Sequence, residues 1–169
     1  MTGGTEAFAE LMAAAEAIRA EATERDARIG GAKLAGIGWA TVELERAARE
    51  LAAGLGIDAG AWVPAPRDAL LGARAWSAPT PVDDGPAIVL LEPDTEGRLA
   101  ATLVRFAEGV AAVYLRDPVA GASAPDPEST EVRASAAVEG TAAQSALGPA
   151  RVVPGGPAWG PHVLLLEPP

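Results

Sequence analysis

The chain has 169 residues, a formal net charge of -10, 49% apolar residues and no cysteine. The length fits one domain, or two half-domains that share a core. The acidic charge argues against nucleic acid or an anionic membrane as partner; it would suit a cationic ligand, although solubility alone explains it. Without cysteine, the chain has no disulfide, thiolate nucleophile or zinc–thiolate site. Because it shows neither a signal-peptide pattern nor an apolar run near the roughly 20 residues of a membrane helix, we expect a cytoplasmic protein.

The first predicted element is an amphipathic helix over residues 5–28. Its apolar residues recur on one stripe, with charged residues mostly opposite. The stripe comprises Phe8, Leu11, Met12, Ala15, Ile18 and Ala22. Gly30 and Gly31 end the helix. We expect this stripe to pack on the same domain or on a second copy of it.

The next segments predict a strand, a helix and three further strands, the first of them weak. Their ranges are 33–42 for the first strand, 43–53 for the helix, then 58–68 as a loop or short strand, 69–76 and 87–91. One face of the first strand carries only Gly36, Gly38 and Ala40, which leaves room for a close neighbour or a ligand. Trp39, on the opposite face, should pack against helices, whereas Trp62 and Trp159 lie in Gly/Pro-rich loops and suggest a lid or a dimer contact.

The chain then continues with a short helix and a less regular C-terminal part. Leu99, Leu103 and Phe106 recur at helical spacing, and Gly109 ends this helix before an apolar strand over 110–115. Residues 117–130 are rich in proline, alanine and serine and are typical of a loop, while 131–146 is ambiguous between strand and poor helix. Strands over 150–153 and 161–166 close the chain.

Three separate stretches of the chain recur at an offset of 75 or 76 residues. Residues 85–93, which end in Leu-Leu-Glu-Pro, are nearly repeated at 160–168; residues 71–74 return at 147–151, and residues 35–39 resemble 111–115. A constant offset across three elements indicates a duplicated βαβββ module. We therefore divide the α+β chain into an N-terminal helix (1–30), a first module with a linker helix (31–109) and a second, degenerate module (110–169) with an irregular stretch at 117–140.

Two stretches resemble a known superfamily. Residues 34–47 are similar to the opening of vicinal oxygen chelate (glyoxalase/bleomycin-resistance) proteins, and residues 90–93 through 108–113 resemble the joint between the halves of methylmalonyl-CoA epimerases. The resemblance implies two βαβββ modules that form an open sheet around a cavity, and a homodimer. In metal-dependent members, each half supplies ligands from its first and last strands.

The positions that correspond to those metal ligands carry no metal-binding side chain in this sequence. The alignment through the same stretches places them at Gly36, Val89, Ala112 and Leu164, none of which can donate to a cation. We therefore expect no metal and no other cofactor, and the Lewis-acid chemistry of the superfamily is not expected here.

Strand alternation predicts which residues face the cavity. The candidate ligand-binding residues are Gly36, Gly38, Val89, Leu91, Ala112, Tyr114, Arg116, His162 and Leu164. His162 is the single histidine and could act as a general base, or it could be structural. Tyr114 could orient a ligand or fill space, and Arg116 could bind an anion or be a solvated strand end. Glu92 and Glu167 are paired by the repeat, and a structural role is the simpler interpretation.

Three functions remain open from the sequence. The first is binding of a small organic molecule in the sheet cavity without a metal, as bleomycin-resistance-type proteins do. The second is an isomerase, lyase or epimerase of the same superfamily that uses His162 and Tyr114 as its catalytic residues. The third is a structural or partner-binding domain whose cavity is filled by side chains.

Overall fold

The computed structural model describes residues 3–117 and 141–168. The helices are α1 (Gly3–Arg25), α2 (Leu44–Leu55) and α3 (Arg98–Phe106), with 3-10 turns at Ala27–Ile29 and Ala59–Ala61. The strands are β1 (Lys33–Ala40), β2 (Val63–Asp68), β3 (Ala73–Ala78), β4 (Ala87–Pro93), β5 (Gly109–Arg116), β6 (Ala143–Ser145), β7 (Gly148–Val152) and β8 (His162–Leu166). The sequence interpretations of 118–140 lie outside the described residues.

The eight strands form one curved sheet in the order β2-β3-β4-β1-β5-β8-β7-β6. In the first half β1 runs parallel to β4, with Gly36 opposite Ala87. In the second half β5 runs parallel to β8, with Ala112 opposite His162. Gly36 and Ala112 are 76 residues apart in the sequence, and Ala87 and His162 are 75 apart. The two halves therefore pair equivalent residues, and the predicted internal repeat is confirmed. The halves join through the antiparallel β1–β5 ladder.

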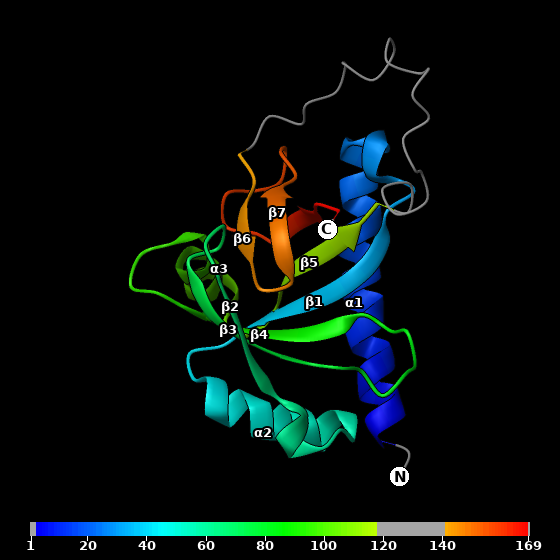
Figure 1. Ribbon diagram of the computed structural model, residues 1–169, viewed down its shortest axis with the longest axis vertical. Coiled ribbons are helices and arrows are strands. Elements are labelled where there is room, and N and C mark those ends of the chain that lie inside the picture. Colours follow the sequence, from blue (N-terminus) through cyan, green and yellow to red (C-terminus); the bar gives the residue numbers. More distant parts are fainter. Residues whose placement is uncertain (1–2, 118–140, 169) are drawn as a thin grey trace.

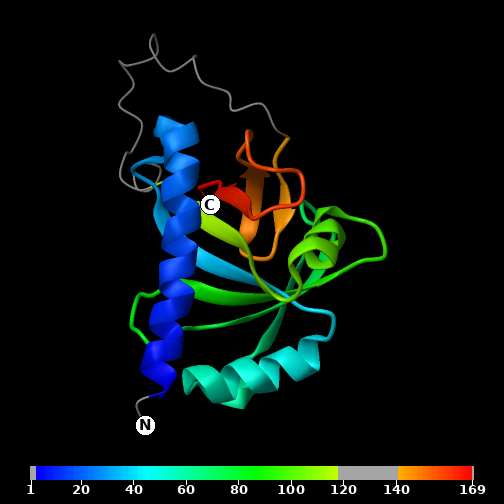
Figure 2. The same ribbon diagram turned by 180° about the vertical axis from the view of Figure 1, so that it is seen from behind.

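Helices α1 and α2 cover the outer face of this sheet. Figure 1 shows the strands in front of α1, and Figure 2, from behind, shows α1 crossing the back of the sheet with α2 beside its N-terminal end. The apolar stripe predicted for the first helix packs here, as Leu11, Ala15 and Ala22 join Ile37 and Val113 in one buried cluster. Apolar burial therefore fixes α1 to the same chain rather than leaving the stripe open for a second copy.

Several local expectations differ from the structure. The first helix ends at Arg25 instead of residue 28, and β1 ends at Ala40 instead of residue 42. The strand expected over 69–76 begins only at Ala73, because Asp68 to Gly72 form a turn in which the Gly72 N–H bonds the Asp68 carbonyl at 2.9 Å. Gly72 has φ of 67°, a conformation that favours glycine. Strand β4 extends through Pro93 instead of ending at Leu91. Trp62 is 8% exposed and belongs to the same buried cluster as Leu44 and Ala48 of α2, so a lid or dimer role for it is wrong.

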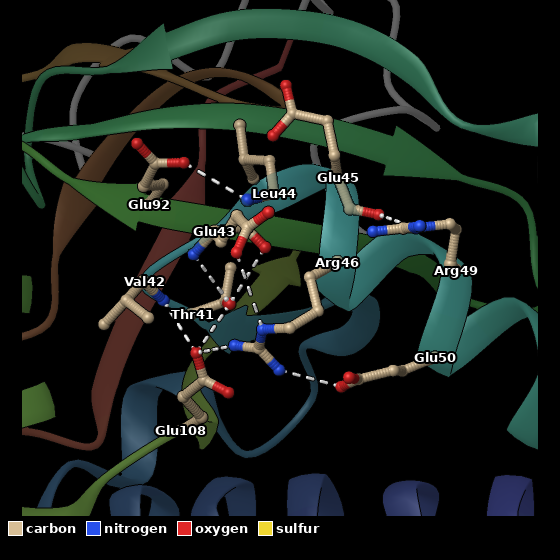
Figure 3. Close-up of polar contacts among 10 residues, drawn as sticks. All are labelled: Thr41, Val42, Glu43, Leu44, Glu45, Arg46, Arg49, Glu50, Glu92 and Glu108. Carbon is tan, nitrogen blue, oxygen red and sulfur yellow. Dashed lines mark hydrogen bonds and ion pairs between the residues drawn. The ribbon is translucent and has the colours of Figure 1, made fainter.

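The junction between β1 and α2 is held by carboxylates from distant parts of the chain. Glu108 Oε1 accepts hydrogen bonds from Thr41 Oγ1 (2.8 Å), the Val42 N–H (2.8 Å) and Arg46 (2.5 Å), as Figure 3 shows. The Arg46 hydrogen bond is the main reason that the pKa of Glu108 is lowered. Glu92 accepts from the Leu44 N–H at 3.2 Å at the start of α2, which gives it the structural role favoured from the sequence.

We expect Glu108→Gln to lower the free energy of unfolding by about 1–2 kcal/mol, because one carboxylate oxygen accepts three donors there. Glu50→Gln is the matched control, since Glu50 pairs with the same Arg46 but its side chain is 62% exposed. We expect that control to cost less than about 0.5 kcal/mol. Urea denaturation at pH 7 measures both changes, and equal losses would contradict this role of Glu108.

Candidate functional site

The inner face of the curved sheet is filled by side chains. Val89, Leu91, Ala112, Tyr114 and Leu164, which were expected to line an open cavity, are each 0% exposed. They form a second core cluster with Leu99 of α3 and with Ala146 from the β6–β7 turn. In this structure the predicted residues therefore form a packed core, and ligand binding by them stays a prediction.

The glycines of β1 accommodate close neighbours. A Cβ atom at Gly36 would collide with Leu147 Cδ1 and lie 3.3 Å from the Tyr114 ring. A Cβ atom at Gly38 would lie 2.9 Å from both Ala112 Cβ and Leu91 Cδ1. The bare face of β1 thus makes room for packed side chains, which is the first of the two interpretations that the sequence left open.

The positions of the expected metal ligands do not fit a metal ion. Gly36, Val89, Ala112 and Leu164 offer no donor atom, and the space next to Gly36 holds Leu147. Among residues 3–117 and 141–168, no three histidine, aspartate or glutamate side chains gather where they could hold a metal ion.

Tyr114 is bound to a buried carboxylate that the sequence analysis missed. Its hydroxyl donates to Asp68 Oδ2 at 2.8 Å. The other oxygen of Asp68 accepts from the Leu70 N–H (3.1 Å) and the Leu71 N–H (3.0 Å), and Oδ2 also accepts from the Ala146 N–H at 3.4 Å. These bonds join the end of β2 to β5 and to the β6–β7 turn. Local Asp-x-Leu-Leu turn chemistry was visible in the sequence, but the bond to Tyr114 was not.

Burial shifts the pKa values of both members of this pair upward. It raises the pKa of Asp68 because the charged carboxylate is disfavoured away from water, and the hydrogen bonds from Tyr114 and the three backbone N–H groups oppose this only in part. It also raises the pKa of Tyr114 well above its usual value, and the charge and hydrogen bond of Asp68 add to that effect. Tyr114 is therefore a neutral hydrogen-bond donor with a structural partner.

His162 lies at the start of β8, apart from the Tyr114–Asp68 pair. It is 4% exposed, and its Nε2 lies 3.1 Å from Thr102 Oγ1 of α3. Burial and then the nearby charge of Arg98 lower its pKa from 6.5 to about 4, against the opposing effect of a hydrogen bond with the Arg98 backbone. Gly160 lies against this pair: its φ is 84°, and a Cβ there would be 3.1 Å from both His162 Nε2 and Thr102 Oγ1. At neutral pH His162 is an uncharged and weak base.

A cavity of about 410 Å³ opens beside His162. It lies where five parts of the chain meet: the last turns of α1, the β2–β3 turn, the first residue of α3, Thr141 before β6, and the β7–β8 loop with the strand ends that it joins. Its polar side chains are Arg25, Arg98, Thr141 and His162, and the rest of its wall is apolar or formed by glycine and proline. Tyr114 does not line it, and Arg116 is exposed at the end of β5, as the solvated-end interpretation expected.

The structure therefore separates the two predicted catalytic candidates. His162 lines the cavity, whereas Tyr114 bonds Asp68 in the filled interior. The sequence analysis missed Arg98 and Thr102. The apolar spacing of this segment predicts a helix, but it gives no signal for the polar residues between the apolar ones. Trp159 is 42% exposed in the loop before β8, with Arg105 stacked 4.6 Å from its ring centre.

Comparison with solved structures identifies the fold. Methylmalonyl-CoA epimerase from Mycobacterium tuberculosis is similar with a TM-score of 0.55 and 19% identity over 80% of this chain and 87% of that one. A variant of the Streptomyces coelicolor methylmalonyl-CoA epimerase, in complex with 2-nitronate-propionyl-CoA, gives a TM-score of 0.51 and 16% identity over 79% and 94%. At these identities the likeness shows the fold alone. The chain has the α+β vicinal oxygen chelate fold, with an N-terminal helix added.

Other comparisons add little. A hypothetical protein from Bacillus halodurans C-125 matches at a TM-score of 0.42 and 19% identity over 50% of this chain, and the match spans only 58% of the length of that chain. No protein-family model matches the sequence, and no curated protein matches it. In the described part of the chain, no helix is long and apolar enough to cross a membrane.

We expect Tyr114→Phe to lower the free energy of unfolding by about 1–3 kcal/mol, because it removes one hydroxyl donor from a buried carboxylate and keeps the ring. Asp68→Asn should also destabilise the protein, and the double variant should cost less than the two single variants together. Urea denaturation of all four proteins gives the coupling. A loss below about 0.3 kcal/mol for Tyr114→Phe would refute this role of the pair.

His162 should make stability depend on pH below neutrality. Its pKa is lowered in the folded protein, so the unfolded chain takes up a proton first as the pH falls through 6.5 toward 4. This contribution is fully present above pH 6.5, and about 2 kcal/mol of it is lost between pH 7 and pH 5. His162→Gln should remove that part of the dependence in urea denaturation. Because there is one histidine, its ring proton signal gives the pKa directly, and a value near 6.5 would contradict the burial of the imidazole.

Proposed function

We propose that this chain binds a small organic molecule without a metal ion, in the cavity beside His162. The observation that carries the proposal is the cavity itself, whose volume of about 410 Å³ lies in the range of small-molecule sites, roughly 300–1,000 Å³. A wall that combines apolar side chains with a few polar ones supports it, because apolar groups bury a ligand and polar groups orient it. The filled inner face of the sheet is the reason for choosing this cavity over the interior expected from the sequence.

A screen by two-dimensional NMR tests this function. Labelled protein is mixed with small organic acids, amides, amines and coenzyme A thioesters, and we expect one or more to shift the amide signals of His162 and Val163. Gly156→Leu should weaken that binding at least tenfold, since the Cβ site of Gly156 has no neighbour closer than Pro161 O at 3.9 Å and added bulk can occupy the cavity wall. Gly54→Leu, at an open position of α2, is the control.

If no compound shifts these signals, the proposal fails and the third function of the sequence analysis takes its place. The chain would then be a structural or partner-binding domain, as its filled sheet interior would suit. The homodimer expected from the resemblance also stays a prediction.

One observation favours an isomerase as a second candidate: the likeness to the Mycobacterium tuberculosis methylmalonyl-CoA epimerase over 80% of this chain. Such an enzyme would need a base next to the substrate, and His162 is the candidate that lines the cavity. The low pKa of His162 makes it a weak base. The expected ligand positions also have no donor atoms for a metal ion that could stabilise the negative charge developing on the substrate. The test is whether the protein catalyses deuterium uptake by methylmalonyl-CoA in D2O. If it does, and if His162→Gln abolishes the uptake, catalysis is favoured over simple binding.

A further inference from the structure

The charges around the cavity differ in sign from those of the whole chain. The chain has a net charge of -10, yet among the described residues that line the cavity none is acidic and two, Arg25 and Arg98, are basic. Local charge rather than net charge governs the potential that a bound molecule meets, because surface charges farther away than about 10 Å are largely screened by salt. The cationic ligand suggested by the overall composition does not fit this wall.

The two arginines are not equivalent. Arg25 Nη1 forms an ion pair with Glu21 at 2.7 Å, so its charge is already compensated. The guanidinium of Arg98 makes no ion pair and no hydrogen bond to any residue in 3–117 or 141–168. Other arginines of the chain, such as Arg46 and Arg74, bond glutamates. Arg98 therefore has its donors available for a molecule in the cavity.

Arg98 and His162 both line the cavity and lie near each other. Arg98 is the first residue of α3, and its charge lies close enough to His162 to lower the pKa of the imidazole. The neutral ring does not add a second charge; it is a polar group of the same wall, and its Nε2 lies 3.1 Å from the buried Thr102 Oγ1. The same wall also contains apolar side chains, among them Leu70, Val152 and Val163. A cation beside an apolar wall suits a molecule with one anionic group and a hydrophobic body.

We propose that the cavity is selective for small organic anions, a carboxylate or a phosphate ester carried on an apolar body, and that Arg98 binds the anionic group. This inference rests on the proposed function, since it names the ligand class of the same cavity. An arginine fork holds both carboxylate and phosphate oxygens through two parallel N–H bonds, which a lysine cannot reproduce.

Matched probes of one shape and different charge test the inference. Phenylacetate, phenyl phosphate and the neutral phenylacetamide are titrated into labelled protein, with inorganic phosphate as an anion that has no apolar body. We expect at least one of the two organic anions to bind about tenfold or more tightly than the amide, and inorganic phosphate to bind more weakly than phenyl phosphate. The relative affinities of phenylacetate and phenyl phosphate decide between carboxylate and phosphate. Raising sodium chloride from 0.05 to 0.5 M should weaken the organic anions and leave the amide unchanged.

Variants assign the effect to Arg98. Arg98→Gln should reduce the affinity for the preferred anion to that for the amide, and Arg98→Lys should restore only part of it. Arg49→Gln removes the same charge from α2, where the Arg49 side chain bonds only its own helix, and should leave all affinities unchanged. Chemical shifts of the backbone amides verify that each variant keeps the fold.

The outcomes separate this inference from the function on which it rests. If the amide binds as tightly as the anions, or if Arg98→Gln and Arg49→Gln behave alike, anion selectivity is overturned while small-molecule binding stands. If none of the probes and no compound of the wider screen shifts the signals of His162 and Val163, both fail together.

Discussion

The fold depends on one buried carboxylate. Asp68 lies at the end of β2, and its carboxylate accepts hydrogen bonds from the Tyr114 hydroxyl of β5 and from a backbone N–H of the β6–β7 turn. It also accepts hydrogen bonds from two N–H groups of its own turn. Strands β2 and β6 are the two edges of the eight-stranded order, and the Ala69 N–H also bonds the Gln144 carbonyl at 2.8 Å. A charged group in a low-dielectric interior is tolerated only when its lone pairs are occupied, so the same contacts that satisfy Asp68 draw the edges together.

Closing the sheet in this way changes what its inner face can do. The curvature brings Leu147 over Gly36 and leaves Val89, Ala112 and Leu164 without access to water. The cavity lies outside this filled interior, where the β7–β8 loop meets α3 beside His162. The chain thus shares the vicinal oxygen chelate fold with metabolic enzymes while its interior serves as a core, which illustrates that chemistry belongs to a site and not to a fold.

Much of the fold could be predicted from the sequence because the relevant signals are local or repeated. The repeat of Leu-Leu-Glu-Pro predicted that β4 and β8 occupy equivalent positions in the two halves. The alternation in β1 predicted that Trp39 packs against the helices, and it does. The filling of the inner face was only one of three alternatives at the level of the sequence, since Leu147 reaches this face from a turn outside the main strands. Asp68 and Arg98 were missed for a related reason: their roles come from residues far away in the sequence, and a single charged residue carries no periodicity.

The β1–β5 ladder is a pseudo-symmetric joint between two modules that are not identical. A single module with the strand order β2-β3-β4-β1 would expose β1 as an open edge, and two identical modules could cover that edge by pairing β1 with β1 in antiparallel fashion. In such a symmetric pair every residue would occur twice. The repeat offset makes Tyr114 the counterpart of Gly38, where a Cβ atom already meets Ala112 and Leu91 at 2.9 Å, so tyrosine is accommodated in one half and not in the other. The bond between Tyr114 and Asp68 is therefore an asymmetric feature, which a symmetric pair of identical modules could not accommodate.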